Sequence, residues 1–325
     1  MNVVYASNNA YVPFLGISLF SLLKNNEKLD KISIFVLADK ISEKNKEILN
    51  DMVIRYGREI KYIDLKEMED FIPFHFNTFG FHPIVLSRLF LDVLLDDNIN
   101  RVLYLDCDTI IDDSLEELEK LDFRKDYVAM VPEMYMPAAN KKLIGLTATE
   151  PYYNAGVILF NLDLIRKDRM REHFLKYYQE RNGELLYNDQ DIINYCCKGR
   201  ICRLSHAYNL SPNLAYFPRY FIKRLQPAYY CKSAEEYKRI LLKPSIIHYM
   251  GDERPWIRGN HNAYRKKFEK YRDMSPWKDL PMVEGQRLYM MCYHILNVLT
   301  KICPWFRMAF TNLIGINKYA WFGKK

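Results

Sequence analysis

Asp106 and Asp108, separated by a single cysteine, are the side chains whose types and spacing best fit cation chemistry. They follow an apolar run at residues 102–105, and apolar residues return at 110 and 111. A short β-branched and aromatic run of this kind is typical of a buried strand. Carboxylates are costly to bury unless they are paired, and their oxygens suit hard cations such as Mg²⁺ and Mn²⁺. One interpretation is therefore a cation site at the end of a strand.

The two carboxylates begin on opposite faces if the strand stays regular. Both reach one ion only if the backbone turns at Cys107 or a water molecule bridges. The alternative is a strand that ends in a polar turn, with one acid capping the next helix. Asp112 and Asp113 have such a role, because Ser114 and the acids after it have the pattern of a helix N-terminus. We therefore leave these two acids out of the site.

The elements around this strand indicate an α/β domain. Three segments are apolar enough for buried strands and two have helical periodicity, in the order strand 2–6, helix 11–23, strand 32–37, helix 42–54 and strand 60–63. This alternation predicts a mainly parallel sheet flanked by helices. Ligands of such sheets bind at the carboxyl ends of the strands, where the turn at residues 7–10 lies. That turn lacks GxGxxG, so a dinucleotide cofactor is not indicated.

Three later blocks combine polar residues with predicted elements. Residues 153–160 lead from polar and small residues into a strand, where Gly156 allows close approach of a ligand or forms a plain bulge. Four polar residues at 188–191 exceed what a capping turn requires. His248 ends a predicted strand at 245–248, where a lone histidine is more often a hydrogen-bonding residue than a ligand. Residues 87–95 and 163–178 are expected to be helical, and residues 71–83 and 134–151 to be loops.

Composition narrows the class of protein. The chain of 325 residues, 49% apolar and 14% aromatic, allows a large core and either one large domain or a domain with an appendage. Its start lacks the pattern of a signal peptide, and no apolar stretch has the length of a transmembrane helix. Seven cysteines without framework or zinc spacing indicate a reducing compartment. We therefore expect a cytoplasmic protein.

The C-terminal segment differs from the rest in charge. From Arg254 onward there are 14 Lys and Arg against four acids, a balance of +10, which leaves −3 of the net +7 for residues 1–253. Residues 285–301 have the period of an amphipathic helix. Its apolar positions are Leu288, Met291, Cys292, Ile295, Leu296 and Leu299. Basic and aromatic residues follow, among them Trp305, Phe306, Arg307, Phe310, Lys318, Trp321, Phe322, Lys324 and Lys325. This predicts either binding to an anionic membrane surface or packing on the main domain or a partner chain; no nucleic-acid module is visible.

Six blocks in order carry a resemblance to a known family. They are ASNNAY (6–11), SRL (87–89), YLDCDT (104–109), YNAGVILFNL (153–162), NDQDIIN (188–194) and IIHYMGDERPW (246–256). The chain resembles, over about residues 1–260, the retaining glycosyltransferases of family 8, which include lipopolysaccharide galactosyl- and glucosyltransferases and glycogenin. The resemblance implies a GT-A fold with a Rossmann-like α/β domain at 1–260 and a helical, basic and aromatic segment at 261–325. It also implies transfer of galactose or glucose from a UDP-sugar with retention, using Mn²⁺ or Mg²⁺.

The same resemblance assigns roles to individual residues. The metal ligands are Asp106, Asp108 and His248, and the residues nearest the reacting carbon are Asp189 and Gln190. The implied donor-binding set is Ala6, Asn8, Tyr11, Arg88, Asp106, Cys107, Glu133, Asn154, Ala155, Gly156, Asp189, Gln190, Gly251 and Arg254. The first turn departs from the family, which often has acids where this chain has Asn8, Asn9 and Ala10. Arg254 stands where the family has a lysine and keeps the positive charge in a different shape.

The mechanism expected from these residues is attack by the acceptor hydroxyl on the face from which UDP leaves. A double displacement needs a nucleophile under the anomeric carbon. Gln190 is a poor nucleophile and Asp189 is the only acid that the motif puts close.

Three other readings of the sequence stay open. One is a nucleotide-sugar-binding protein impaired in catalysis by the changes at 8–10. A second is a haloacid-dehalogenase-type phosphatase, which the position of Thr109 directly after Asp108 opposes. A third is a self-glycosylating protein, given the 25 tyrosines. The acceptor class is a glycan or a lipid-linked saccharide of lipopolysaccharide type, which fits a place on the inner face of the cell membrane. The choice of sugar, the linkage and homo-oligomer formation are left undecided by the sequence.

Overall fold

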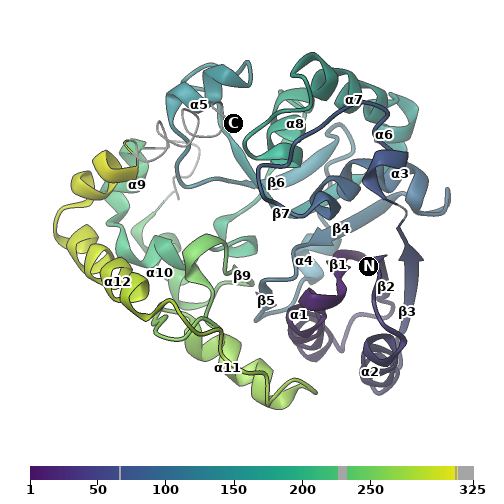
Figure 1. Ribbon diagram of the computed structural model, residues 1–325, viewed down its shortest axis with the longest axis horizontal. Coiled ribbons are helices and arrows are strands. Elements are labelled where there is room, and N and C mark those ends of the chain that lie inside the picture. The colour runs from purple at the N-terminus through teal and green to yellow at the C-terminus, as the bar shows by residue number, and fades with distance from the viewer. Residues whose placement is uncertain (66, 226–232, 312, 314–325) are drawn as a thin grey trace.

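A computed structural model describes the chain except residues 66, 226–232, 312 and 314–325 (Figure 1). Within the described part, seven strands form one sheet in the order β3-β2-β1-β4-β7-β6-β8. Their bounds are β3 Glu59–Asp64, β2 Ser33–Asp39, β1 Asn2–Asn8, β4 Arg101–Leu105, β7 Tyr153–Asn161, β6 Val128–Pro132 and β8 Ile201–Arg203. Strands β3, β2, β1 and β4 are parallel, β7 is antiparallel to both its neighbours, and β6 and β8 are parallel to each other. The predicted mainly parallel α/β sheet is confirmed.

Helices cover both faces of the sheet, because alternate residues of its strands point to opposite sides. One core lies under α1 (Val12–Asn25) and α2 (Glu43–Ile54) and continues into the C-terminal elements. The other core lies under the 3₁₀ helix η3 (Pro83–Phe90), α3 (Leu91–Leu94), α6 (Leu162–Lys167), α7 (Met170–Glu180) and α8 (Asn188–Cys196). Val3 and Val4 show the alternation, since both are fully buried and belong to different cores. Burial on both faces explains why these strands are continuously apolar in the sequence.

Two small elements extend the sheet at the end of β4. The chain turns after Leu105 and forms β5 (Thr109–Ile111), which pairs in antiparallel fashion with β9 (Ile246–His248). Residues that lie far apart in sequence therefore meet beside the carboxyl ends of β1 and β4. Further helices in the described part are α4 Glu116–Glu119, α5 Ala138–Leu143, α9 Arg219–Leu225, α10 Ala234–Leu242, α11 Arg265–Met274 and α12 Arg287–Ile302, with 3₁₀ turns η1 Asn9–Tyr11, η2 Met68–Asp70, η4 His206–Tyr208, η5 Pro212–Tyr216 and η7 Gly251–Glu253.

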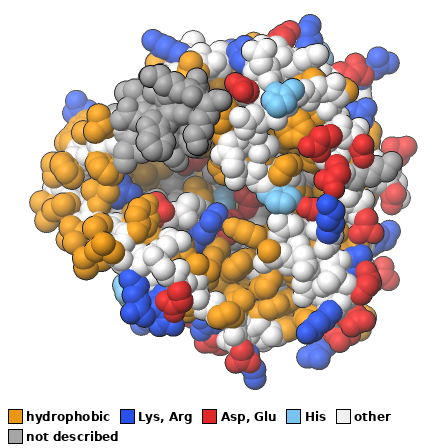
Figure 2. Space-filling model, viewed as in Figure 1, with side chains coloured by type: hydrophobic (Ala, Val, Ile, Leu, Met, Phe, Trp, Pro, Cys, Tyr) orange, Lys and Arg blue, Asp and Glu red, His pale blue; other side chains and the backbone are white. Residues whose placement is uncertain are grey.

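Helix α12 packs on the domain through its less apolar side. Its buried residues are Met290, Tyr293, Asn297 and Thr300. The predicted apolar stripe faces outward instead, with Leu288, Met291, Ile295 and Leu299 among the exposed hydrophobic residues. Figure 2 shows hydrophobic side chains gathered at the left edge of the molecule, over α12. No helix among the described residues is long and apolar enough to cross a membrane. Lys318, Trp321, Phe322, Lys324 and Lys325 lie outside the described residues.

Three local predictions need correction. The expected loop at 134–151 contains helix α5, whose buried Lys141 donates to the carbonyl oxygens of Ala148 and Glu150. The expected helix at 87–95 is mostly the 3₁₀ helix η3, followed by one turn of α3. The expected helix at 163–178 is two helices, because Arg169 adopts a left-handed conformation with φ 50° between them.

Candidate active site

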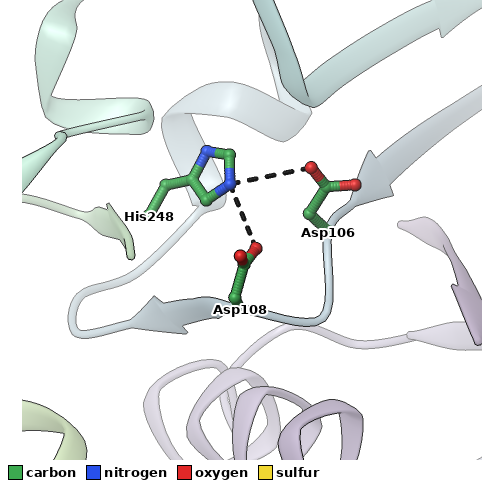
Figure 3. Close-up of side chains that lie close together, drawn as sticks. All are labelled: Asp106, Asp108 and His248. Atoms are coloured by element: carbon green, nitrogen blue, oxygen red, sulfur yellow. Dashed lines mark ion pairs between the residues drawn. The ribbon is translucent and has the colours of Figure 1, made fainter. Parts of the chain in front are cut away.

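The turn after β4 brings Asp106 and Asp108 to one side of the chain, as the sequence required for a shared ion. The turn is held by Thr109, whose hydroxyl donates to the carbonyl oxygen of Asp106 (2.8 Å). His248 faces them because it pairs with Thr109 in the β5–β9 ladder. Its Nε2 lies 3.1 Å from Oδ1 of Asp108 and 3.6 Å from Oδ2 of Asp106 (Figure 3). The structure thus brings together the three predicted metal ligands.

Gly156 makes room for this cluster. The backbone amide of Asp106 donates to the carbonyl oxygen of Gly156 (2.8 Å), because antiparallel β7 brings its first residues against the end of β4. A Cβ at position 156 lies 2.0 Å from Cε1 of His248 and 2.8 Å from Oδ2 of Asp106, distances that real side chains do not show. The absence of a side chain at Gly156 therefore allows His248 and Asp106 to approach the strand, which continues through this residue.

The guanidinium of Arg88 holds the carboxylate of Asp106 in place. Its guanidinium is buried and donates to Asp106 Oδ1 (2.9 Å) and the carbonyl oxygen of Ala155 (2.5 Å), and its Nε lies 3.1 Å from Asp189 Oδ2. The planar group also lies over the ring of Tyr104, 4.1 Å from its centroid. The fork of a guanidinium suits several acceptors at once. In this structure Arg88 contacts protein groups, so it acts on the site by orienting Asp106 and Asp189.

A second set of polar side chains lies behind His248. Nδ2 of Asn154 donates to Glu133 Oε2 (2.9 Å), and its Oδ1 accepts from the backbone amide of Gly156 (2.9 Å). The same oxygen accepts from Nδ2 of Asn209 (2.8 Å), and Asn209 Oδ1 lies 3.0 Å from His248 Nδ1. Asn209 and His248 are both 3% exposed. This network connects the predicted sugar-binding acid Glu133 to the metal site.

Helix α8 carries the predicted catalytic pair in its first turn. Gln190 is fixed at both ends, because its Oε1 accepts from the amide of Ala155 (2.8 Å) and its Nε2 donates to the hydroxyl of Tyr152 (3.1 Å). Tyr152 in turn donates to Asp191 Oδ1 (2.6 Å). Asp189 points the other way and pairs with Arg88. Asn188 donates through Nδ2 to the carbonyl oxygen of Thr78 (3.1 Å), so each of the four polar residues that begin this helix has a side-chain contact.

Burial and neighbouring charges shift several pKa values in the site. Burial raises the pKa of Asp189 to about 7, against the lowering influence of Arg88, and it raises the pKa of Asp191 to about 6. Burial also raises the pKa of Glu133. At Asp108 burial works in the same direction, but the attraction of His248 and Arg254 is stronger and leaves the pKa below its usual value. Burial opposes protonation of His248, and the three acids Asp108, Asp106 and Glu133 outweigh it, so its pKa is raised.

The first turn lies at the same edge of the sheet, since β1 is the parallel neighbour of β4. Asn8 uses its side-chain oxygen to accept from the amide of Tyr11 (3.1 Å). Cys107 contacts the first strand through a bond from its thiol to the carbonyl oxygen of Ala6 (3.3 Å). Opposite, Gly251 turns the chain with φ 61°, and Nε of Arg254 lies 4.0 Å from Asp108 Oδ2. These predicted donor-binding residues therefore line both sides of the metal site.

Two residues of the site have no role in the sequence patterns. Asn209 and Tyr152 stand outside the six blocks, and each contacts a predicted site residue through its side chain. In the sequence, each is a polar side chain among apolar neighbours, and a buried amide or hydroxyl needs a hydrogen-bond partner. Their partners come from other parts of the chain, so the signal does not point to them.

The donor set fits a divalent cation. One ligand atom each from Asp106, Asp108 and His248 lie within 4.8 Å of one another. The two carboxylates favour a hard divalent cation, and the imidazole adds a nitrogen ligand. A Cβ at position 156 would occupy space between the side chains of His248 and Asp106.

Comparison with known proteins agrees with this geometry. The sequence matches glycosyl transferase family 8 over residues 2–259, and the chain therefore belongs to this family of glycosyltransferases. It is 31% identical over 215 residues to a Haemophilus influenzae protein with the provisional name of a glycosyltransferase, an alignment that spans 65% of this chain and 64% of that protein. It is 26% identical to lipopolysaccharide 1,2-glucosyltransferase of Escherichia coli, over 86% of this chain and 80% of that one.

A solved structure shares the fold. An active-site mutant of LgtC superimposes with a TM-score of 0.71 at 25% identity, covering 85% of this chain and 96% of the other. The fold is therefore that of the GT-A glycosyltransferases. Family membership together with the Asp106, Asp108 and His248 cluster implies a divalent cation and a nucleotide-sugar donor.

Proposed function

We propose that this glycosyltransferase moves galactose or glucose from a UDP-sugar to a hydroxyl of a lipopolysaccharide-type glycan or lipid-linked saccharide, with retention of configuration. The observation that carries the proposal is the cluster of Asp106, Asp108 and His248 at the carboxyl end of β4. Relatives named as lipopolysaccharide glucosyl- and galactosyltransferases support the acceptor class and both sugars. The catalytic domain is residues 1–260, and residues 261–325 form the C-terminal segment.

Each side chain has a separate task. Mn²⁺ or Mg²⁺ held by Asp106, Asp108 and His248 supplies positive charge for the diphosphate that departs. Arg254 adds a cation beside Asp108. Arg88 keeps Asp106 in place. The first-turn residues Ala6, Asn8 and Tyr11, with Cys107, form the nucleotide side of the site.

The sugar side is formed by Glu133, Asn154, Ala155, Gly156 and the start of α8. A front-face reaction is supported because the carboxyl of Asp189 is paired with Arg88, and Gln190 is a poor nucleophile. The Gln190→Ala variant is therefore expected to keep substantial transfer activity. Complete loss of transfer in this variant, with UDP binding intact, counts against the front-face route.

The first experiment is UDP release from UDP-glucose and UDP-galactose, with and without Mn²⁺. Metal-dependent release identifies the sugar, and the Asp108→Asn variant is expected to reduce it to background. Asp113→Asn is the matched control, because Asp113 caps a turn and pairs with Lys243 away from the site. If the protein binds UDP with metal but releases none from either sugar, the impaired binding protein becomes the better interpretation. If it neither releases nor binds UDP, the UDP-sugar proposal is wrong, and release of phosphate from a phosphate monoester favours the phosphatase.

The exposed face of α12 supports a second part of the proposal, attachment to an anionic membrane surface. Hydrophobic side chains continue outward beyond the helix at Trp305, Phe306 and Phe310, and the segment from Arg254 has a balance of +10. Large exposed apolar patches mark interaction sites, and apolar residues beside basic ones suit the interface of a membrane.

Vesicle binding tests this attachment. The full chain is expected to co-sediment with vesicles of anionic lipid more than with vesicles of zwitterionic lipid. Replacing Ile295 and Ile302 with Asn is expected to abolish this binding. Leu242→Asn on α10 is the control, since the exposure of Leu242 (70%) lies between those of Ile295 (54%) and Ile302 (77%) but the residue is on another helix. Equal sedimentation of both variants excludes α12 as the contact.

A further inference from the structure

The two ring nitrogens of His248 have different surroundings. Nε2 faces the carboxylates of Asp106 and Asp108, and Nδ1 lies 3.0 Å from Oδ1 of Asn209. A neutral imidazole binds a metal through the nitrogen that carries no hydrogen. The partner of Nδ1 therefore decides whether Nε2 is available to a cation.

The row of hydrogen-bonded amides behind His248 begins at a group that can only be a donor. The backbone N–H of Gly156 only donates, so the Asn154 atom that it contacts must be Oδ1. Glu133 accepts at the other side of the same amide, which is consistent with Nδ2 there. Amide orientations follow from their hydrogen-bond networks, and here both neighbours of Asn154 indicate the same orientation.

The orientation of Asn154 then sets that of Asn209. Oδ1 of Asn154 faces the Asn209 amide at 2.8 Å, and two oxygens at that distance repel each other. Asn209 must present its NH₂ group to Asn154, which leaves its Oδ1 for His248. An oxygen at that position accepts a hydrogen from Nδ1 and stabilises the ring form whose Nε2 lone pair faces the two aspartates.

We propose that Asn209 is a positioning residue for the metal ligand His248: through the chain Gly156, Asn154, Asn209 it keeps the ring hydrogen on Nδ1 and leaves Nε2 free for the cation. The inference rests on the proposed metal role of Asp106, Asp108 and His248. Outer partners of this kind fix the tautomer and orientation of metal-binding histidines.

The backbone holds Asn209 in the required place. It follows η4 and precedes Leu210, whose amide donates to the carbonyl oxygen of Ile246 (2.9 Å) and whose carbonyl accepts from the amide of His248 (2.9 Å). This pairing with β9 puts Asn209 beside the ring of His248. At 3% exposure it lies behind the ring and acts through it.

Nitrogen NMR of the wild-type protein tests the tautomer directly. The protein is labelled with ¹⁵N-histidine, and the signal of His248 among seven histidines is identified by its absence in His248→Gln. With Mg²⁺ and UDP present, we expect a hydrogen on Nδ1 and none on Nε2. A hydrogen on Nε2 overturns the inference whatever the variants show.

Two variants of similar size to asparagine test the consequence for the metal. Asn209→Leu removes the acceptor for Nδ1 and is expected to weaken Mn²⁺ binding roughly 10–100-fold, the usual effect of losing an outer partner. Asn209→Asp keeps an acceptor for Nδ1 but places its second oxygen against Asn154 Oδ1, so it is expected to lose less affinity than Asn209→Leu without matching the wild type. Mn²⁺ binding is followed by the paramagnetic resonance of the free ion, with and without UDP.

The outcomes separate this inference from the proposed function. If the wild type binds no Mn²⁺, the proposed metal site is wrong. If the wild type and Asn209→Leu bind Mn²⁺ equally well, the site stands and the role of Asn209 is wrong. If Asn209→Leu does not fold, the wild-type spectrum and the Asn209→Asp variant decide.

Discussion

Buried polar groups occur in two regions of this molecule, and the regions differ in whether these groups have all their hydrogen-bond partners. In the metal site, Asn154, Asn209 and Gln190 each have partners at both ends of the amide. Under α12, the carboxyl of Glu253 accepts a hydrogen bond from Tyr293 at Oε1 (2.5 Å). Its buried Oε2 has no hydrogen-bond partner among the described residues.

The two regions have different tasks: one fixes side chains in advance of ligand binding, and the other attaches helix α12 to the domain. A network in which each member is satisfied fixes side chains in one arrangement, which a site for a cation and a diphosphate requires. A buried carboxyl with one partner is costly in its charged form. The first region therefore holds side chains in one arrangement, whereas the second contains a buried carboxyl with an unpartnered oxygen.

The largest effect is expected for Gly156→Ala, which breaks the first region at its most crowded point. The added Cβ lies 2.0 Å from the ring of His248. We expect Mn²⁺ affinity to fall roughly 100-fold and the free energy of unfolding to fall by about 1–3 kcal/mol, measured by Mn²⁺ resonance and urea unfolding.

Gly16→Ala is the matched control, because its Cβ lies 2.0 Å from the ring of Trp277, away from the metal site. It is expected to lower stability in the same way and to leave Mn²⁺ affinity unchanged. Equal loss of metal affinity in both variants would mean that strain anywhere in the core disturbs the site, and the view of a locally preorganised network would fail.

Arg88→Lys is expected to have the next largest effect. Lysine keeps the charge, but its single ammonium group cannot donate to Asp106 and Ala155 and also pair with Asp189. Loss of charge-assisted bonds in a buried place is expected to lower the free energy of unfolding by about 3 kcal/mol. Arg124→Lys is the control, since Arg124 pairs with Asp122 on the surface and exposed pairs contribute little. A loss below that of the control contradicts a bridging role for Arg88.

The sequence predicted more of the first region than of the second. The strands were predictable from their apolar runs, and the two aspartates from their place after one of them. His248 was predicted to join them only through the resemblance to family 8, since a lone histidine at a strand end more often forms an ordinary hydrogen bond. Asn209 was not predictable, because its role depends on the orientation of an amide 55 positions earlier in the chain.

The orientation of α12 could not be predicted from the sequence, for a different reason. Periodicity identified which residues share a face of the helix, and the stripe at Leu288, Met291 and Ile295 is real. It did not show which face is buried, because the buried side is held by polar contacts of Tyr293 with Glu253 and Asn213. Helical patterns predict burial when apolar contact is the main attraction, and here it is not.

The smallest expected effect concerns the dependence of stability on pH through Glu253. Burial raises the pKa of this carboxyl from 4.5 to about 7. The folded state therefore binds the proton more tightly, so the contribution of Glu253 to stability is full at acidic pH and is lost as the pH rises toward about 7. At about 1.4 kcal/mol per pH unit, this amounts to roughly 2 kcal/mol between about pH 5.5 and about pH 8.

The Glu253→Gln variant is neutral at each pH, so its urea-unfolding free energy is expected to fall less over this range than that of the wild type. Other buried acids titrate in both proteins, and the difference between the two curves isolates Glu253. Glu116→Gln on the surface is the control and is expected to follow the wild type. Parallel curves for all three proteins would show that the carboxyl under α12 is as well accommodated when charged as the groups of the metal site, and the contrast between the two regions would disappear.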